Sequence, residues 1–211
     1  GYTMASSDSF TLTIKGKSAH GARPQEGIDA IVIATEVISN LQNISSRLVD
    51  PTEALVISIG KIQGGVRSNI IADKVVMEGT VRTLNPELRD KIPEIIEKIV
   101  AGICQGYGAS YNLDYERQLP PVYNHPEFVK AVLPWLTQSL GEANVVEVKP
   151  QLVSEDFAFY ATRIPAFYFF LGVKSPGQAT TAPLHSPNFN PDEKAITIGI
   201  KAMCHLVLNA L

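Results

Sequence analysis

Four segments in the first 120 residues carry the alternation of apolar and polar side chains that is typical of half-buried strands. In residues 9–15, for example, Phe10, Leu12 and Ile14 share one face. The other three predicted strands are residues 54–62, residues 73–84 and the neighbourhood of Tyr111, Leu113 and Tyr115. We expect the apolar faces of these strands to meet in one core.

Two stretches of helical periodicity separate these strands, one from about residue 26 to 46 and one after Asn85-Pro86. Asn85 is expected to be the N-cap with Pro86 at the first helical position, and Gly106 and Gly108 to end the helix. Pro93 should kink this second helix or mark its true start. The predicted buried stripes are Ile31, Ala34, Ile38 and Leu41 in the first helix, and Leu88, Ile92, Ile95, Ile99 and Ile103 in the second.

The resulting order is strand-helix-strand-strand-helix-strand, which is the split βαβ pattern. It predicts a four-stranded sheet with two helices on one face, a ferredoxin-like α+β module, over residues 8–117.

Residues 118–211 indicate a second, α/β unit. We predict helices at 126–140, from near Glu155 and from Pro191 to Leu211, with short strands at 145–148 and 166–171. In the last helix, Ile196, Ile200, Met203 and Val207 are expected to pack inward. Because these strands are too few for a complete doubly wound sheet, the unit fits the C-terminal part of a larger domain.

The composition of the chain argues against some classes of binding partner. The 211-residue chain has a net charge of −3, so it lacks the basic excess that would neutralise nucleic-acid phosphates or an anionic membrane. Its apolar runs fall short of the ~18 residues that cross a bilayer. No signal peptide opens the chain, so we expect a cytoplasmic protein. Cys104 and Cys204 lie in apolar helical patterns, which predicts buried thiols and no disulfide.

Two histidine-containing loops are candidates for chemistry. His185 lies in Leu184-His185-Ser186-Pro187-Asn188-Phe189, between a predicted strand and the last helix, where α/β sheets place ligand groups. An imidazole there suits Zn, Mn, Ni or Co, although a surface loop histidine is the alternative. His20 lies among small residues in Gly16-Lys17-Ser18-Ala19-His20-Gly21, which would allow backbone and substrate to approach closely.

Taken in order with Ser68-Asn69-Ile70-Ile71-Ala72-Asp73 and Gly79-Thr80-Val81-Arg82-Thr83, these motifs resemble the dizinc amidohydrolase and exopeptidase family. The most similar branch is the N-acyl-amino-acid amidohydrolases, such as hippurate hydrolase and the indole-acetyl-amino-acid hydrolases. Val153 stands before Ser154-Glu155-Asp156-Phe157, where that family usually has glycine. The resemblance covers essentially the whole chain and implies that it begins where the family's lid, or dimerisation, domain begins.

The resemblance also implies residue roles. His185 would be a ligand of one of two divalent metal ions, and His20 would reach the partner subunit's active site to hydrogen-bond the oxyanion. Asn69, Arg82 and Gly172 would bind substrate, with Arg82 gripping a carboxylate; Arg67 and Arg23 remain rivals for that task. Glu155 and Asp156 would begin a helix beside the site.

The function implied is metal-dependent hydrolysis of the amide bond of N-acyl amino acids or small peptides. Alternatives are a dipeptidase or aminopeptidase of the same superfamily, or a dimerisation module without chemistry. The metals would be zinc or else Mn, Co or Ni, and the family's other ligands and general-base Glu lie upstream of the segment present here. We therefore expect residues 8–117 to form a homodimer, residues 118–211 with 1–7 to belong to the catalytic domain, and this chain alone to be inactive and to hold no metal.

Overall fold

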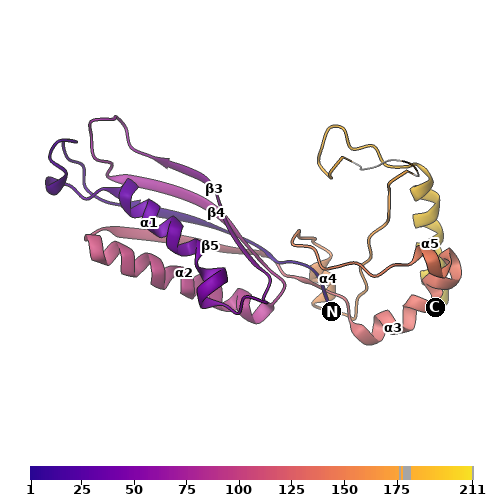
Figure 1. Ribbon diagram of the computed structural model, residues 1–211. Coiled ribbons are helices and arrows are strands. Elements are labelled where there is room, and N and C mark those ends of the chain that lie inside the picture. Colours follow the sequence, from indigo (N-terminus) through magenta and orange to yellow (C-terminus); the bar gives the residue numbers. More distant parts are fainter. Residues whose placement is uncertain (176, 178–181, 211) are drawn as a thin grey trace. The chain divides into compact units, whose positions relative to one another are not determined.

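The computed structural model describes residues 1–175, 177 and 182–210, and the chain divides into two compact units (Figure 1). The first, here called the sheet unit, comprises residues 2–123 and 150–162. The second, here called the helical unit, comprises Gly1 with residues 124–149 and 163–211.

An antiparallel four-stranded sheet forms the centre of the sheet unit, with the strand order β3-β4-β2-β5. Two helices, α1 and α2, lie side by side on one face of it, so the predicted four-stranded sheet with two helices is confirmed (Figure 1). The elements are β2 (Ser7–Lys15), α1 (Ala30–Gln42), β3 (Leu55–Gly64), β4 (Lys74–Thr83), α2 (Pro86–Tyr107) and β5 (Ser110–Leu119).

One apolar core lies between the sheet and the two helices. Phe10, Leu12 and Ile14 of β2 are buried there as predicted, next to Met77 of β4. Gly79, opposite Phe10 in the register, is required by this packing, because a side chain at that position would collide with the Phe10 ring. The glycine of the Gly79–Thr83 motif therefore has a structural explanation.

The predicted helix stripes were partly wrong. Helix α2 buries a stripe shifted by one residue from Ile95, Ile99 and Ile103, which are only partly buried, and in α1 Ile31 is exposed. Both helices carry apolar residues at adjacent positions, so periodicity alone did not decide which set faces the sheet. The buried sets are Ala30, Ile33, Ala34, Val37 and Leu41 in α1, and Leu88, Ile92, Ile96, Val100 and Cys104 in α2.

The ends of α2 follow the predicted signals. The Asn85 side chain accepts hydrogen bonds from the N–H groups of Glu87 and Leu88, and Gly108 ends the helix in a left-handed conformation. The helix continues through Pro93, which therefore does not mark its start. Helix α1 is shorter than predicted because Asp29 caps it, accepting from Ile31 and Val32, and a π-helical turn, η2 (Ile44–Leu48), follows it.

A buried carboxylate joins three elements of the sheet unit. The side chain of Asp8 is fully buried and accepts hydrogen bonds from Arg89 of α2, the Tyr115 hydroxyl of β5 and the Gln118 N–H, over 2.7–3.2 Å. Burial, followed by the Asp8 charge, raises the pKa of Tyr115. Asp8 precedes the predicted strand, and no periodic signal marked it as buried.

The remainder of the sheet unit lies beside the start of the chain. Strand β1 (Tyr2–Met4) pairs with β6 (Val122–Tyr123), and the Ala5 N–H donates to the carbonyl groups of Gln151 and Val153. The helix predicted from Glu155 begins three residues later, as α4 (Ala158–Ala161). Glu155 instead lies in the preceding turn, where its carbonyl accepts from the Ala158 N–H.

In the helical unit, α3 (Pro126–Leu140) packs against α5 (Lys194–Ala210), and the short helix η3 (Glu142–Asn144) follows α3. The strands predicted at 145–148 and 166–171 are absent. In residues 167–170 the aromatic rings of Phe167 and Phe169 contact each other, as do those of Tyr168 and Phe170. Contacts between side chains two residues apart are typical of an extended backbone. The Asn124 side chain bonds both the N–H and the carbonyl of Tyr168, but no neighbouring strand among the described residues completes a ladder.

The apolar face predicted to be buried on α5 is exposed. Ile196, Ile200, Met203 and Val207 are 66%, 59%, 53% and 53% exposed, and only Ala195 and Ala202 of this helix are buried. Among the described residues, α3 is the one helix packed against α5, and a single helix does not cover both sides of another. Cys204, on the same helix, is also exposed, contrary to prediction, whereas Cys104 is buried; both are free thiols.

Candidate active site

Two loops meet at one end of the four-stranded sheet and bring His20 close to Asn69. The N–H of Gly21 donates to the carbonyl of Asn69 (2.8 Å), and the N–H of Ile71 donates to the carbonyl of Ala19 (2.9 Å). His20 itself lies opposite Ile70 in a β-bridge. A side chain at Gly21 would begin 3.0 Å from the Asn69 carbonyl oxygen, so this close approach favours glycine. Two predicted site residues that are far apart in sequence therefore lie together.

The His20 ring is held in a defined tautomer. Its Nδ1 accepts a hydrogen bond from the Ala22 N–H (3.1 Å), so Nδ1 carries no proton. In the neutral ring the proton is then on Nε2. Because the residue is exposed, a bound carbonyl or oxyanion could reach this Nε2–H donor.

Arg82 lies near the other end of β4, on the sheet face that the helices leave open. Its Nη1 donates to the Ser154 hydroxyl (3.1 Å), and the side chain is half-buried. Lys74 begins β4 at the end of the sheet that carries the His20–Asn69 loops. At a rise of ~3.3 Å per residue, Lys74 and Arg82 are about 26 Å apart. Within one chain, the structure therefore does not bring Arg82 to His20 and Asn69.

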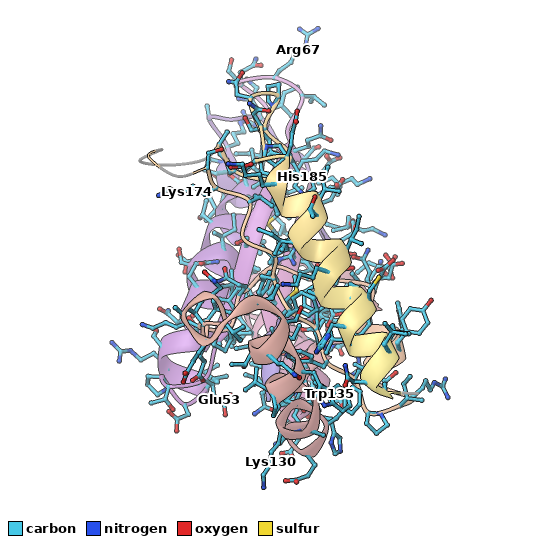
Figure 2. The ribbon with its side chains drawn as sticks, turned by 90° about the vertical axis from the view of Figure 1, so that its right-hand side faces the viewer. Glu53, Arg67, Lys130, Trp135, Lys174 and His185 are labelled. Carbon is cyan, nitrogen blue, oxygen red and sulfur yellow. The ribbon has the colours of Figure 1, made fainter. Side chains whose placement is uncertain are left out.

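The rival arginines lie at the His20 end of the sheet. Arg67 is exposed in the segment that joins β3 to β4, two residues before Asn69, and Figure 2 shows its side chain pointing outward. Arg23 follows His20 in its loop and forms a long contact with Glu26 (3.5 Å), both side chains being exposed. These two cations are available near His20, whereas Arg82 is not.

The segment before α4 departs from the expected turn. Val153 does not have a positive φ, so the backbone at this position does not require the glycine that is usual in similar proteins. The Val153 carbonyl accepts a hydrogen bond from Ala5, and Ser154 accepts one from Arg82. The Ser154 motif therefore supports Arg82.

His185 lies in a tight turn of the helical unit, just before α5 (Figure 2). Its φ of 69° is the one positive value at a non-glycine position in the described part of the chain. Such strain costs on the order of 1–3 kcal/mol and is concentrated at functional sites. The turn is held by the Ser186 N–H, which donates to the Pro183 carbonyl (3.1 Å), and by the Ser186 hydroxyl, which accepts from Asn188 (3.2 Å).

The helical unit also contains the capped start of α5 and Gly172, the last of the predicted substrate-binding residues. Asp192 caps the helix by accepting from the Lys194 N–H, and this bond is the main cause that lowers the pKa of Asp192. Gly172 is exposed, and a side chain added there would meet nothing within 4 Å, so packing does not explain this glycine. Over residues 1–175, 177 and 182–210, no three His, Cys, Asp or Glu side chains form a metal-binding group.

The other histidines do not contribute to the site. His125 occupies the N-cap position of α3, and its N–H donates to the Ala166 carbonyl. The buried Nε2 of His205, on α5, has no hydrogen-bond partner within the described part of the chain. No helix in that part is both long and apolar enough to span a bilayer.

Comparison with known proteins shows that the chain is similar to proteins named as hydrolases. It is 41% identical over 206 residues to a probable hydrolase of Synechocystis, covering 97% of this chain and 52% of that protein. It is 38% identical over 200 residues to the N-acetyldiaminopimelate deacetylase of Priestia megaterium, covering 95% of this chain and 52% of that enzyme. The chain therefore spans about half the length of these curated relatives.

A solved structure shows the same relationship. The Bacillus subtilis YXEP protein, described as a dinuclear metal-binding peptidase of the M20 family, is 32% identical with a TM-score of 0.76. The match covers all of this chain and 51% of that protein. Residues 3–107 also match the family model of the peptidase dimerisation domain. The chain therefore belongs to the M20 peptidase family, and residues 3–107 carry its dimerisation domain.

Proposed function

We propose that this chain is part of a metal-dependent amidohydrolase that cleaves the amide bond of N-acyl amino acids or small peptides. The observation that carries the proposal is the placement of the His20 Nε2–H donor beside Asn69, in a chain similar along nearly its whole length to a deacetylase and a dinuclear metal peptidase. Residues 8–117 would act as the lid and dimerisation module, and residues 118–211 with 1–7 as part of the catalytic domain.

His185 would hold one of two divalent metal ions, with zinc the first candidate and Mn, Co or Ni the alternatives. An exposed imidazole on a strained turn fits this role, because imidazole is a common ligand of these metals and such strain is concentrated at functional sites. A catalytic zinc uses about three protein ligands, so the other ligands come from outside the described residues. When bound, the metal pair would activate a water and polarise the scissile carbonyl.

His20 and Asn69 would serve the active site of the partner subunit. Within one chain Arg82 is at the far end of the sheet from them, so one site that uses all three residues takes His20 and Asn69 from one copy and Arg82 from the other. The His20 Nε2–H would donate to the oxyanion that develops in the transition state, and Asn69 and Arg82 would bind the carboxylate end of the substrate. Gly172 would bring backbone amides near the substrate.

Subunit mixing in the full-length enzyme tests this arrangement. His20→Ala should lower kcat by about 10²–10³ with little change in KM, because the donor acts on the transition state. Mixing this variant with His185→Ala subunits should restore activity, since one of the two sites in each heterodimer is then intact. Verified heterodimers without recovery would exclude a role of His20 in the partner's site.

Metal analysis tests His185 separately. In the full-length enzyme, His185→Ala should release one of the two metal ions and abolish hydrolysis while the dimer remains, and His125→Ala is the matched control that keeps both ions. Full metal content in His185→Ala would show that His185 is only a loop residue. We expect the 211-residue chain alone to retain no stoichiometric metal after dialysis.

The relatives' names leave a second substrate class open, because one is a deacetylase and another a peptidase. A panel of hippurate, N-acetyl amino acids and dipeptides separates these classes for the full-length enzyme. Preference for the acylated amino acids would support the amidohydrolase assignment, and hydrolysis of dipeptides alone would replace it with the peptidase assignment.

A further inference from the structure

The two buried side-chain polar atoms that lack a hydrogen-bond partner in the described part of the chain belong to residues of one groove. These atoms are Ser139 Oγ of α3 and His205 Nε2 of α5. The groove, here called the α3–α5 groove, has a volume of about 420 Å³ and lies between two packed helices of the helical unit. It is lined by Gln138, Ser139, Lys201, Cys204, His205 and Leu208.

Helix packing does not explain why these two side chains are polar. Ser139 is only 8% exposed, and inside a helix its hydroxyl could donate to a carbonyl of the preceding turn, as Thr137 does to Leu133 (3.0 Å). The Ser139 hydroxyl makes no such bond. Withdrawing a polar atom from water without giving it a partner is costly, and an apolar residue at either position would avoid this cost. The pair is therefore a candidate for ligand binding.

The side chains around the α3–α5 groove can all donate hydrogen bonds. The Lys201 ammonium is a donor only, and the Ser139 hydroxyl and the His205 ring nitrogen can each donate. The Gln138 amide adds a further donor, and no Asp or Glu is among the lining residues. Lys201 forms no ion pair with another described residue, so its charge is available. This set of groups suits an anion with acceptor oxygens.

The groove also has an apolar part. Leu208 lies seven residues after Lys201, which places it two turns further along the same side of α5. A carboxylate with a short alkyl chain matches both parts, because its oxygens need donors and its chain needs apolar contact. The volume of about 420 Å³ is also typical of small-molecule sites, which range over about 300–1,000 Å³.

The groove and the exposed apolar face of α5 lie on opposite flanks of the helix. At 3.6 residues per turn, Lys201 and His205 lie about 100° and 60° to one side of the buried Ala202. Met203 and Ile196 of the apolar face lie about 100° and 120° to the other side. Further chain that covers the apolar face can therefore leave the groove open.

We propose that the α3–α5 groove binds a small organic carboxylate. Lys201, Ser139 and His205 donate to its oxygens, and Leu208 contacts its alkyl chain. Ser139 and His205 reach the ligand by rotation about their side-chain torsions, since both polar atoms are shielded from solvent in the structure. None of these residues takes part in the proposed hydrolysis, so the two proposals can fail independently.

Titration of the 211-residue chain with butyrate, followed by NMR of the histidine rings, provides the first test. Butyrate should shift the His205 resonances saturably and leave those of His125 unchanged. Butyramide, which has the same shape without the charge, should bind at least about 10-fold more weakly. Inorganic phosphate, which has charge but no alkyl chain, should also bind at least about 10-fold more weakly.

The other results of this titration overturn the proposal in different ways. Equal affinity for butyramide would show that the site does not select an anion. Equal affinity for phosphate would show that it does not select an organic ligand. Butyrate that leaves the His205 resonances unshifted would show that the groove does not bind carboxylates.

Substitutions separate a binding role from a packing role. Ser139→Ala and Lys201→Gln should each raise the butyrate dissociation constant about 10-fold or more, because each removes a hydrogen bond to a charged ligand. Lys130→Gln, on α3 but outside the groove, is the matched control and should leave it unchanged. Ser139→Ala should not lower the melting temperature, because it removes a buried hydroxyl that has no partner. A lower melting temperature with unchanged butyrate affinity would show that Ser139 serves packing alone.

The thiol of Cys204 gives a second test that does not depend on NMR. Cys204 is exposed and lines the groove, whereas Cys104 is buried. Saturating butyrate should slow the reaction of Cys204 with N-ethylmaleimide several-fold in the wild-type chain, and the same butyrate concentration should slow it less in Lys201→Gln. An unchanged rate in the wild-type chain at saturating butyrate would overturn the placement of the ligand in the α3–α5 groove.

Discussion

In the sheet unit, α1 and α2 each turn an apolar stripe onto a four-stranded sheet, whereas in the helical unit α5 leaves Ile196, Ile200, Met203 and Val207 exposed. The difference lies in the number of covering elements. Four strands and two helices enclose a core on their own, but two helices and an extended segment do not. The comparison indicates that the sheet unit encloses a core of its own, whereas the described residues leave the apolar face of α5 uncovered.

The fact that the chain spans about half the length of its relatives agrees with this interpretation. An exposed apolar helix face is an interaction surface or an aggregation site when nothing covers it. In the proposed full-length enzyme, the rest of the catalytic domain would cover this face. Association of the 211-residue chain through α5 would then be a consequence of this uncovered face, and Ile200→Glu should abolish it.

Among substitutions, the largest effect on the free energy of unfolding is expected at Asp8, the buried carboxylate of the sheet unit. Asp8→Ala should lower the free energy of unfolding by about 3–5 kcal/mol, because it leaves the Arg89 guanidinium without its partner. Asp114→Ala, at an exposed position of β5, should change it by less than about 0.5 kcal/mol. Urea denaturation followed by circular dichroism measures both. Similar values for the two variants would mean that Asp8 does not stabilise the sheet unit.

A matched pair of isoleucines compares the two units directly. Ile96→Ala on α2 removes a fully buried side chain and should cost about 2–5 kcal/mol. Ile200→Ala on α5 removes a largely exposed one and should cost less than about 0.5 kcal/mol. Thermal melts of the two variants measure the loss of stability. A larger loss of stability from Ile200→Ala than from Ile96→Ala would contradict the difference between the units.

A smaller effect is expected at Tyr115, whose hydroxyl donates to Asp8 (3.1 Å). Because folding raises the pKa of Tyr115, its neutral form stabilises the folded state below the ordinary tyrosine pKa of about 10, and this contribution is lost as the pH rises further. Tyr115→Phe should cost about 1.5–3 kcal/mol at pH 7 and reduce the loss of stability above pH 10. An unchanged alkaline profile would show that Tyr115 does not titrate with unfolding.

The sheet was predictable because half-buried strands have a strict period of two, as in β2 and β4, and because Asn85-Pro86 is a local helix signal. The buried stripes of the helices were not predictable, because adjacent apolar residues such as Ile95 and Ile96 allow two alternative faces to pack against the sheet. The strand at 166–171 and the buried face of α5 failed for a different reason. Both predictions assumed neighbours that the described residues do not supply.

The candidate site was only partly predictable. Motifs identified His20, Asn69 and His185 as residues of interest, but no local pattern says that two loops 50 positions apart join in a bridge at His20 and Ile70. Nor did the sequence show that Arg82 lies at the other end of its sheet, or that Ala22 fixes the His20 tautomer. These relations depend on strand register and backbone geometry, which arise only in the folded chain.

Native-state hydrogen exchange of the 211-residue chain tests most directly the claim that the sheet unit encloses a core of its own and the helical unit does not. We predict that amides of the central strands β2 and β4 exchange at the rate of global unfolding, and that amides of α5 exchange much faster through local opening. Equal protection of α5 and the central strands would contradict the account, because it would show that the helical unit is as fully stabilised as the sheet unit.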